Sequence, residues 1–139
     1  MPEKKPHVLF VCNTNGGKSQ LAAALLRQAA GERVQVFSAG LIPALHINEL
    51  AAEVVAEVGA DMRAEVPTAL TEEALRAADR VVIVGEAQVP ELEGVAMERW
   101  VPGEAPSGLA TERERMAFLR DDLAARVAAL NAELGSTSH

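Results

Sequence analysis

Short apolar, strand-forming segments alternate with helix-forming segments along this chain of 139 residues. Strands are expected at Val8–Cys12, Val34–Ser38, Arg80–Val84 and Met97–Trp100. The third of these is almost wholly apolar, which is typical of a strand that is covered on both faces. Such alternation predicts a parallel sheet with helices on both sides, so we expect a three-layer α/β/α fold with four parallel strands.

Capping residues mark the ends of the expected helices. The helices are expected from Lys18 to Ala30, from Asn48 to Val58, from Thr71 to Ala78, and from a Thr111–Glu114 capping box to Leu134. Glycines 31, 59 and 135 should end three of them, with a frayed tail after the last. A chain of this length has room for one core, so we expect residues 1–139 to form a single domain.

One stretch carries most of the chemical information, because the only cysteine, Cys12, ends the first strand just before a helix. The loop between them consists of Asn13, Thr14, Asn15, Gly16 and Gly17. Ligands bind at the carboxyl ends of such strands, and the unpaired N–H groups of the loop and first helical turn favour an anion and a thiolate. Lys18 adds a local positive charge, and Ser19 offers a hydroxyl to the sulfur.

Simpler interpretations of this stretch remain. Cys12 could be an inert, buried cysteine, and the two glycines could form an ordinary turn. A nucleotide-binding loop of the type G-x-x-x-x-G-K-[ST] would need a glycine where Cys12 stands, and a later strand ending in aspartate, whereas Val84 is followed by Gly85. The coincidence of several parts of an anion cradle favours an oxyanion site.

Composition excludes some partners. The net charge of −7 argues against nucleic acid, and no apolar run approaches the ~18 residues of a membrane span. The segment Met1–Pro6 leads into a strand and not into a signal-peptide core, and a lone cysteine excludes an internal disulfide. We therefore expect a cytoplasmic protein without nucleic-acid or membrane partners, and without a metal or a tightly bound cofactor.

The loop resembles the C-x5-R-S loop of the low-molecular-weight protein tyrosine phosphatases and of the arsenate reductases that share their fold. Cys12, Asn15 and Ser19 match this pattern, and Lys18 replaces the arginine. Ser38-Ala39-Gly40 resembles the end of the family's second strand. Within the superfamily, the arsenate–mycothiol transferase type is the most similar in the stretches 16–20, 57–62, 79–83 and 98–100.

The resemblance implies a reaction. Arsenate would be held by the amides of residues 13–18 and by the Lys18 ammonium, and the Cys12 thiolate would attack arsenic. Phosphate and sulfate would compete for the same loop. The family's general acid is an aspartate in a late Asp-Pro loop, where Glu104 is the nearest candidate here and could equally be a solvated carboxylate. Lys18 loses the planar fork of arginine, and the chain has no tyrosine to flank a phosphotyrosine, so phosphatase activity is the less favoured alternative.

Counting cysteines separates the subtypes further. Thioredoxin-coupled arsenate reductases of this fold use two more cysteines, near the positions of Val84 and Val89 in this sequence. A single sulfur cannot resolve its own adduct, so an external low-molecular-weight thiol is expected, which could be mycothiol, bacillithiol or glutathione. A glutaredoxin-like (mycoredoxin-like) protein would recycle it. A protein that binds oxyanions without turnover is a further alternative.

Three other residues have two interpretations each. His46 could border the pocket, although a surface position is favoured. Arg99 could recognise an anionic thiol or form a surface salt bridge. Trp100 is more typical of a core than of a site.

Overall fold

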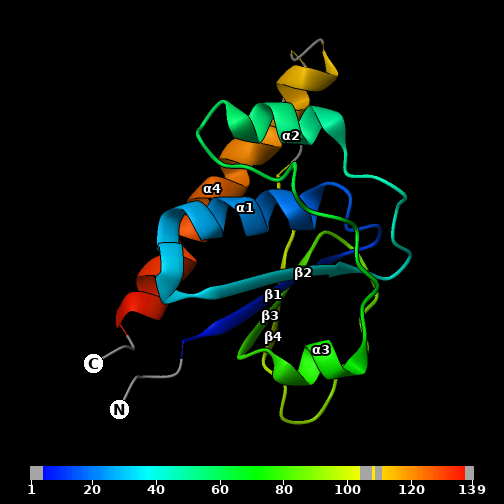
Figure 1. The fold of residues 1–139 in the computed structure, drawn as a ribbon, viewed down its shortest axis with the longest axis vertical. Coiled ribbons are helices and arrows are strands. Elements are labelled where there is room, and N and C mark those ends of the chain that lie inside the picture. Colours follow the sequence, from blue (N-terminus) through cyan, green and yellow to red (C-terminus); the bar gives the residue numbers. More distant parts are fainter. Residues whose placement is uncertain (1–4, 104–107, 109–110, 137–139) are drawn as a thin grey trace.

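The computed structural model describes residues 5–103, 108 and 111–136. In chain order the elements are β1 (His7–Cys12), α1 (Lys18–Ala30), the 3₁₀ turn η1 (Gly31–Arg33), β2 (Gln35–Gly40), α2 (Glu49–Ala56), α3 (Glu72–Ala77), β3 (Arg80–Val84), β4 (Met97–Trp100) and α4 (Glu112–Ser136). All strand pairs are parallel, in the order β2-β1-β3-β4, with α1, α2 and α4 on one face and α3 on the other (Figure 1). The predicted three-layer fold with four parallel strands is confirmed.

Strand β1 lies inside the sheet and supplies both layers of the core. Val8 and Phe10 belong to the larger hydrophobic cluster under α1, α2 and α4, whereas Leu9 and Val11 belong to the smaller cluster that includes Leu75 of α3. Successive side chains of a strand point to opposite faces, so a run of apolar residues is needed to fill both clusters. This explains why the strand reads as continuously apolar.

Helix α1 occupies the predicted range. It is rich in alanine and leucine, which are strong helix formers, and nine of its residues are buried. It ends at Gly31, whose φ of 60° lies in the left-handed region and whose N–H donates to the carbonyl of Arg27. The helix is therefore fixed at both ends, with its first turn at the carboxyl end of β1.

Helices α2 and α3 begin where the sequence predicted. The side chain of Asn48 accepts a hydrogen bond from the Ala51 N–H at 3.0 Å, and that of Thr71 accepts from the Ala74 N–H at 3.0 Å. Helix α2 ends at Ala56, two residues before the predicted end, because the chain already turns toward Gly59 with its φ of 88°. Helix α3 is one residue shorter than predicted.

Two predicted boundaries are wrong. Strand β2 runs from Gln35 to Gly40 instead of ending at Ser38, because it pairs with β1 up to the partners Cys12 and Gly40. Helix α4 continues through Gly135 to Ser136, because Gly135 keeps a negative φ and does not turn the chain. The predicted tail after Leu134 therefore begins in the helix, and residues 137–139 lie outside the described part.

The strand order creates a crevice at one edge of the sheet. From β1 the chain passes through α1 to β2 on one side, and later returns to β3 on the other side of β1. Open α/β sheets bind ligands at such a reversal, beyond the carboxyl ends of the strands. Cys12 at the end of β1 and Val84 at the end of β3 stand at this place.

Candidate active site

The loop of residues 13–17 is held from outside by the segment that follows β2. Four N–H groups of that segment donate to loop carbonyls: Leu41 to Cys12 (3.2 Å), Ile42 to Asn13 (2.7 Å), Ala44 to Thr14 (2.9 Å) and Asn48 to Gly16 (2.6 Å). A trans peptide points its N–H opposite to its C=O. The N–H groups of residues 13, 14, 15 and 17 therefore point away from that segment, toward the inside of the loop.

The sulfur of Cys12 receives hydrogen bonds from this arrangement. The Asn15 N–H donates to Sγ at 3.1 Å, and the Ser19 hydroxyl lies 2.9 Å from Sγ. Cys12 is 5% exposed and contributes to the wall of a pocket, so the sulfur is shielded yet reachable from one side. The sulfur is therefore held in one position, with one side open to a ligand in the pocket.

Asn15 orients the serine. It is fully buried with a φ of 53°, a left-handed conformation that asparagine tolerates better than most residues. Its Oδ1 accepts from the Thr68 N–H at 2.9 Å and from Gln20 Nε2 at 3.3 Å, and its Nδ2 donates to the Ser19 hydroxyl at 2.8 Å. Because a backbone N–H can only donate, Thr68 fixes which end of the Asn15 amide faces Ser19. The Ser19 proton is then available to Sγ.

Gly40 lets the loop pass close to β2. A Cβ at this position would lie 2.7 Å from both the Asn15 nitrogen and the Thr14 carbonyl carbon. No side chain fits at that distance from backbone atoms. The Ser38-Ala39-Gly40 match noted in the sequence therefore has a steric meaning, since Gly40 is where the loop leans on the neighbouring strand.

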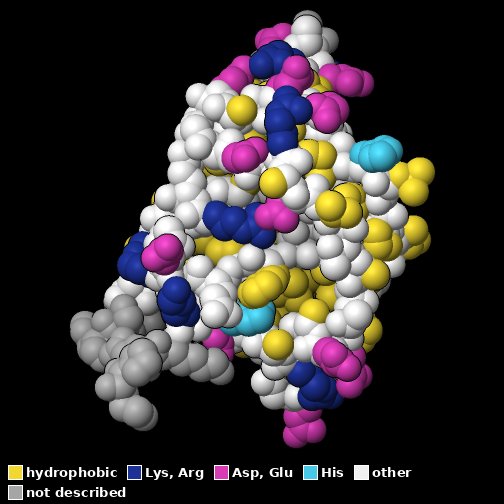
Figure 2. All heavy atoms as spheres, in the orientation of Figure 1, with side chains coloured by type: hydrophobic (Ala, Val, Ile, Leu, Met, Phe, Trp, Pro, Cys, Tyr) yellow, Lys and Arg dark blue, Asp and Glu magenta, His cyan; other side chains and the backbone are white. Residues whose placement is uncertain are grey.

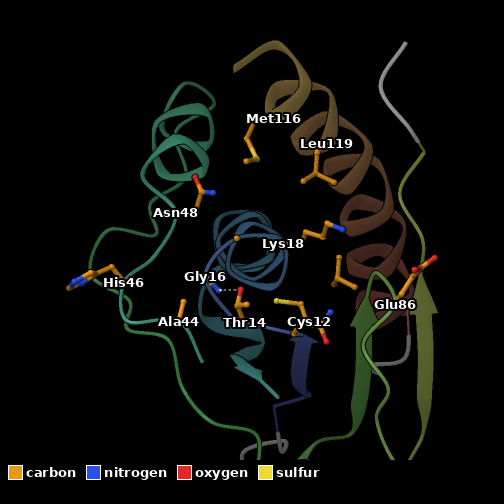
Figure 3. A pocket seen from close by; sticks show the side chains of 13 residues that line it. Cys12, Thr14, Gly16, Lys18, Ala44, His46, Asn48, Glu86, Met116 and Leu119 are labelled. Carbon is orange, nitrogen blue, oxygen red and sulfur yellow. Dashed lines mark hydrogen bonds between the residues drawn. The ribbon is translucent and has the colours of Figure 1, made fainter. Parts of the chain in front are cut away.

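A pocket of about 480 Å³ opens above Cys12. Loop residues form its floor, Met116 and Leu119 of α4 form one wall, and Ala44, His46 and Asn48 border the opposite side (Figure 3). The Lys18 side chain extends from the first turn of α1 toward the side where Glu86 lies. Lys18 and Glu86 are thus the charged side chains among the described lining residues, apart from His46.

Large apolar side chains are exposed in the chain on either side of Ala44. Ile42 and Leu45 are 77% and 89% exposed. Val66 is also exposed, two residues before Thr68, whose N–H bonds Asn15. In Figure 2, hydrophobic side chains gather along one side of the molecule. Leu45 and Val66 also line a second hollow together with Glu49, Arg63 and Glu65, so this side offers both apolar and charged side chains.

The predicted site residues are distributed as follows. Cys12, Asn13, Thr14, Gly16, Gly17 and Lys18 line one pocket, while Asn15 and Ser19 are buried behind it and bonded to the sulfur. Glu104, the predicted general acid, lies outside the described residues. His46 borders the pocket, but its ring points away from it (Figure 3).

Two further predictions concerned β4. Trp100 is buried and its ring packs against Phe10 with a centroid distance of 5.6 Å, so it is a core residue as favoured. Among the described residues, Arg99 contacts a backbone oxygen: its Nη1 donates to the Gly85 carbonyl at 2.7 Å. No ion pair of Arg99 is seen in this part of the chain, and its recognition of an anionic thiol stays a prediction.

Sequence reasoning missed several residues that shape the site. Gln20 and Thr68 hold Asn15, Gly85 lies against Lys18, and Met116 and Leu119 supply the α4 wall. The position of Gly85 directly after an apolar strand could have indicated that it lies at the ligand-binding edge of the sheet. Thr68, Met116 and Leu119 carry no local signal, because only the tertiary fold brings them to Cys12.

Two absences concern the described residues alone. Within residues 5–103, 108 and 111–136, no group of three or more histidine, cysteine or carboxylate side chains is arranged to hold a metal ion. In the same part of the chain, no helix combines the length and the apolar character that crossing a bilayer requires.

Fold and site together define an α/β protein with a cysteine at the centre of an inward-facing amide loop. Residues 7–101 match the family model of the low molecular weight phosphotyrosine protein phosphatases. The chain belongs to this family, and the resemblance predicted from the loop is confirmed.

Similar proteins include arsenate reductases. The arsenate reductase of Bacillus subtilis (strain 168) is 31% identical over 127 residues, which are 86% of this chain and 91% of that protein. The solved structure of the thioredoxin-dependent arsenate reductase Cg_ArsC1' of Corynebacterium glutamicum has a TM-score of 0.82 and 30% identity, covering 99% of this chain and 66% of that one. An arsenate reductase solved in a phosphate-binding state has a TM-score of 0.73 and 25% identity, covering 93% and 98% of the two chains.

Proposed function

We propose that this protein is an arsenate reductase in which Cys12 is the nucleophile and a low-molecular-weight thiol is the co-substrate. The observation that carries the proposal is the Cys12 sulfur itself, which lies within hydrogen-bond distance of the Asn15 N–H and the Ser19 hydroxyl inside a loop of inward N–H groups. The relatives named as arsenate reductases support arsenate as the substrate. The reducing cytoplasm is the compartment in which such a thiol stays active.

Arsenate would bind in the loop as a tetrahedral oxyanion. The inward N–H groups of residues 13, 14 and 17 donate to its oxygens, while that of Asn15 stays on the sulfur, and the first turn of α1 adds the positive end of its dipole. The Lys18 ammonium, at the same end of α1, supplies the full charge. These donors hold the anion with its arsenic facing Sγ, which is the requirement for in-line attack.

In the first step the Cys12 thiolate attacks arsenic, forming an S–As bond while one As–O bond breaks. The leaving oxygen departs as water after protonation, the role that we assign to Glu104. Arsenic remains pentavalent at this stage. The external thiolate can then attack arsenic and carry it away, regenerating the Cys12 thiolate, or attack Sγ. In the second case an S–S bond forms and the S–As electron pair passes to arsenic, which leaves as trivalent arsenite.

The thiol dependence follows from the single sulfur. Thioredoxin reduces a disulfide that the enzyme presents to it. An enzyme with a single cysteine can form a disulfide only with a second molecule, as a mixed disulfide. Thioredoxin with its reductase and NADPH should therefore not sustain turnover until mycothiol, bacillithiol or glutathione is added with a glutaredoxin-like recycler. Multiple turnovers with thioredoxin and no small thiol would contradict the proposal that a small thiol is the co-substrate. Thioredoxin would then be the reductant, as in the name of the Corynebacterium relative.

The test of the nucleophile is the Cys12→Ser variant in an arsenate-turnover assay with each thiol in turn. Turnover should be lost while the far-UV spectrum and the urea midpoint are retained. Glu104→Gln tests the acid and should slow the first step by roughly 10²- to 10⁴-fold, the usual contribution of a general acid. Turnover above a few per cent in the serine variant contradicts the covalent mechanism.

The family description favours phosphomonoester hydrolysis as a second candidate. The same loop and thiolate could attack phosphorus, with water in place of the second thiol. Hydrolysis of an aryl phosphate without arsenate turnover would establish it. Protection of Cys12 by phosphate without either reaction would identify a protein that only binds oxyanions.

A further inference from the structure

We propose that Gly85 is a positioning residue for the oxyanion site, and that it sets the place of the Lys18 ammonium. Arg99 would hold Gly85 in the conformation that this requires. The inference rests on the proposed function only in taking a tetrahedral oxyanion as the ligand. It assigns a role to the end of β3, which supplies no group to the reaction itself.

Gly85 directly follows β3 and is fixed from both sides by β4. Its φ of 94° lies in the left-handed region, its N–H donates to the Trp100 carbonyl at 2.8 Å, and its carbonyl accepts from Arg99 Nη1 at 2.7 Å. Hydrogen bonds from charged donors are the stronger ones. The peptide groups on both sides of this Cα are therefore clamped to the neighbouring strand.

The Cα of Gly85 lies against Lys18. A Cβ built here would stand 3.4 Å from Lys18 Nζ and 3.6 Å from its Cδ. These are ordinary van der Waals distances, so the lysine stem and its ammonium pack directly against the clamped backbone of Gly85 at this wall of the pocket. Figure 3 shows the Lys18 side chain running toward the side of the pocket on which Glu86 lies.

A lysine needs such a support more than an arginine does. Its ammonium is a point charge on a flexible four-carbon stem, and it lacks the planar fork that orients a guanidinium on an oxyanion. When the stem is already confined against Gly85, the Lys18 side chain loses less conformational entropy as the anion binds. The position of the charge is thus set by backbone that lies almost seventy residues further along the chain.

The test compares Gly85→Ala with Gly94→Ala in the full-length chain. Gly94 has a φ of 84°, and a Cβ there would meet nothing within 4 Å. Both substitutions impose a left-handed strain, but only the first places it, with a new methyl group, in contact with Lys18. The readout is the phosphate concentration that protects Cys12 from iodoacetamide, which needs no turnover. Gly85→Ala should weaken phosphate protection by about three- to tenfold, part of the contribution of one charged hydrogen bond, because the strained backbone and the added methyl group shift the ammonium, while Gly94→Ala should leave it within about twofold.

A double-mutant cycle with Lys18→Met identifies the cause. In the Lys18→Met background, Gly85→Ala should weaken phosphate protection no further. Arg99→Met changes no glycine and should give a smaller loss of the same kind, also absent in that background, so the test survives if Gly85→Ala fails to fold. Unchanged protection in Gly85→Ala, or a loss that persists without Lys18, would overturn the inference. If arsenate is not turned over but the cycle behaves as described, the proposed function fails and the inference stands.

Discussion

Asn15 joins the cysteine and the first turn of α1 to Thr68, which lies far away in sequence. Its amide receives the Thr68 N–H and Gln20, and passes a hydrogen bond to Ser19, which lies 2.9 Å from the Cys12 sulfur. Its backbone N–H reaches the same sulfur directly. One residue thus fixes both the conformation of the loop and the direction of the serine hydroxyl.

Replacing Asn15 separates these two contributions. Asn15→Ala should lower the free energy of unfolding by about 2 kcal/mol, because the Thr68 N–H loses its buried acceptor and alanine is strained at a φ of 53°. Asn15→Gly should be less destabilised, by about 1 kcal/mol, because glycine adopts that φ freely. Urea titrations measure both. Equal stability of the two variants would mean that the loop gives up its left-handed conformation.

Gly40→Ala should disrupt the loop from the neighbouring strand. Its Cβ would lie 2.7 Å from two backbone atoms of residues 14 and 15, so the loop must move. We expect a loss of about 1–3 kcal/mol of stability, and phosphate should no longer protect Cys12 from iodoacetamide. Gly103→Ala is the control, because its Cβ would meet nothing within 4 Å. Full phosphate protection in Gly40→Ala would show that the close approach is not needed.

The helices of the upper layer are joined by ion pairs as well as by apolar contacts. Arg113, near the start of α4, bonds Glu53 and Glu57 at the end of α2, and Arg120 bonds Glu57 at 2.9 Å and the Val54 carbonyl at 2.8 Å. The same part of α4 carries Met116 and Leu119, which line the pocket. The clamp therefore holds the α4 wall against α2.

This clamp should weaken in acid. The hydrogen bond from Arg113, with a further one from Arg120, holds the pKa of Glu57 below its usual value of 4.5. A lowered pKa in the folded state gives stability that is complete above about pH 4.5 and is lost as the pH falls through the lowered value. Glu57→Gln should therefore lower the urea midpoint slightly at pH 7 and leave it unchanged well below the lowered pKa. A midpoint that differs equally at both pH values would point to packing instead of charge.

Elements whose signals are local were predicted well, and those that depend on partners were not. Helix α1 and strands β1, β3 and β4 follow from apolar runs and capping, with differences of at most one residue. The end of β2 depends on its pairing with β1, and the end of α4 on the negative φ that Gly135 keeps. Neither can be read from the residues that form the boundary.

The site shows the same division across the molecule. The loop and its cysteine are contiguous in sequence, so their chemistry could be predicted from order and type alone. Thr68 reaches Asn15 and Gly85 reaches Lys18 because β1 lies between β2 and β3, and the α4 wall reaches the pocket because α4 packs on α1 and α2. A sequence without a known strand order cannot supply these partners.

The overall charge opposes the ligand that the site favours. With a net charge of −7, an approaching anion is repelled at long range and attracted only near the loop. Raising the ionic strength from about 0.01 M to about 0.1 M shortens the Debye length from about 30 Å to about 10 Å. The ratio of Cys12 alkylation rates by anionic iodoacetate and neutral iodoacetamide should therefore rise. A falling ratio would show that Lys18 dominates the field well outside the pocket.

The hydrogen bonds from the segment after β2 make the loop observable from outside. The amides of Leu41, Ile42 and Ala44 lie in irregular, largely exposed chain, yet each is bonded to a carbonyl of the loop or of Cys12. Their exchange with deuterated solvent requires those bonds to open. Protection factors at these three positions thus measure the free energy of opening around Cys12 without labelling the cysteine. An oxyanion that settles into the loop should slow their exchange together.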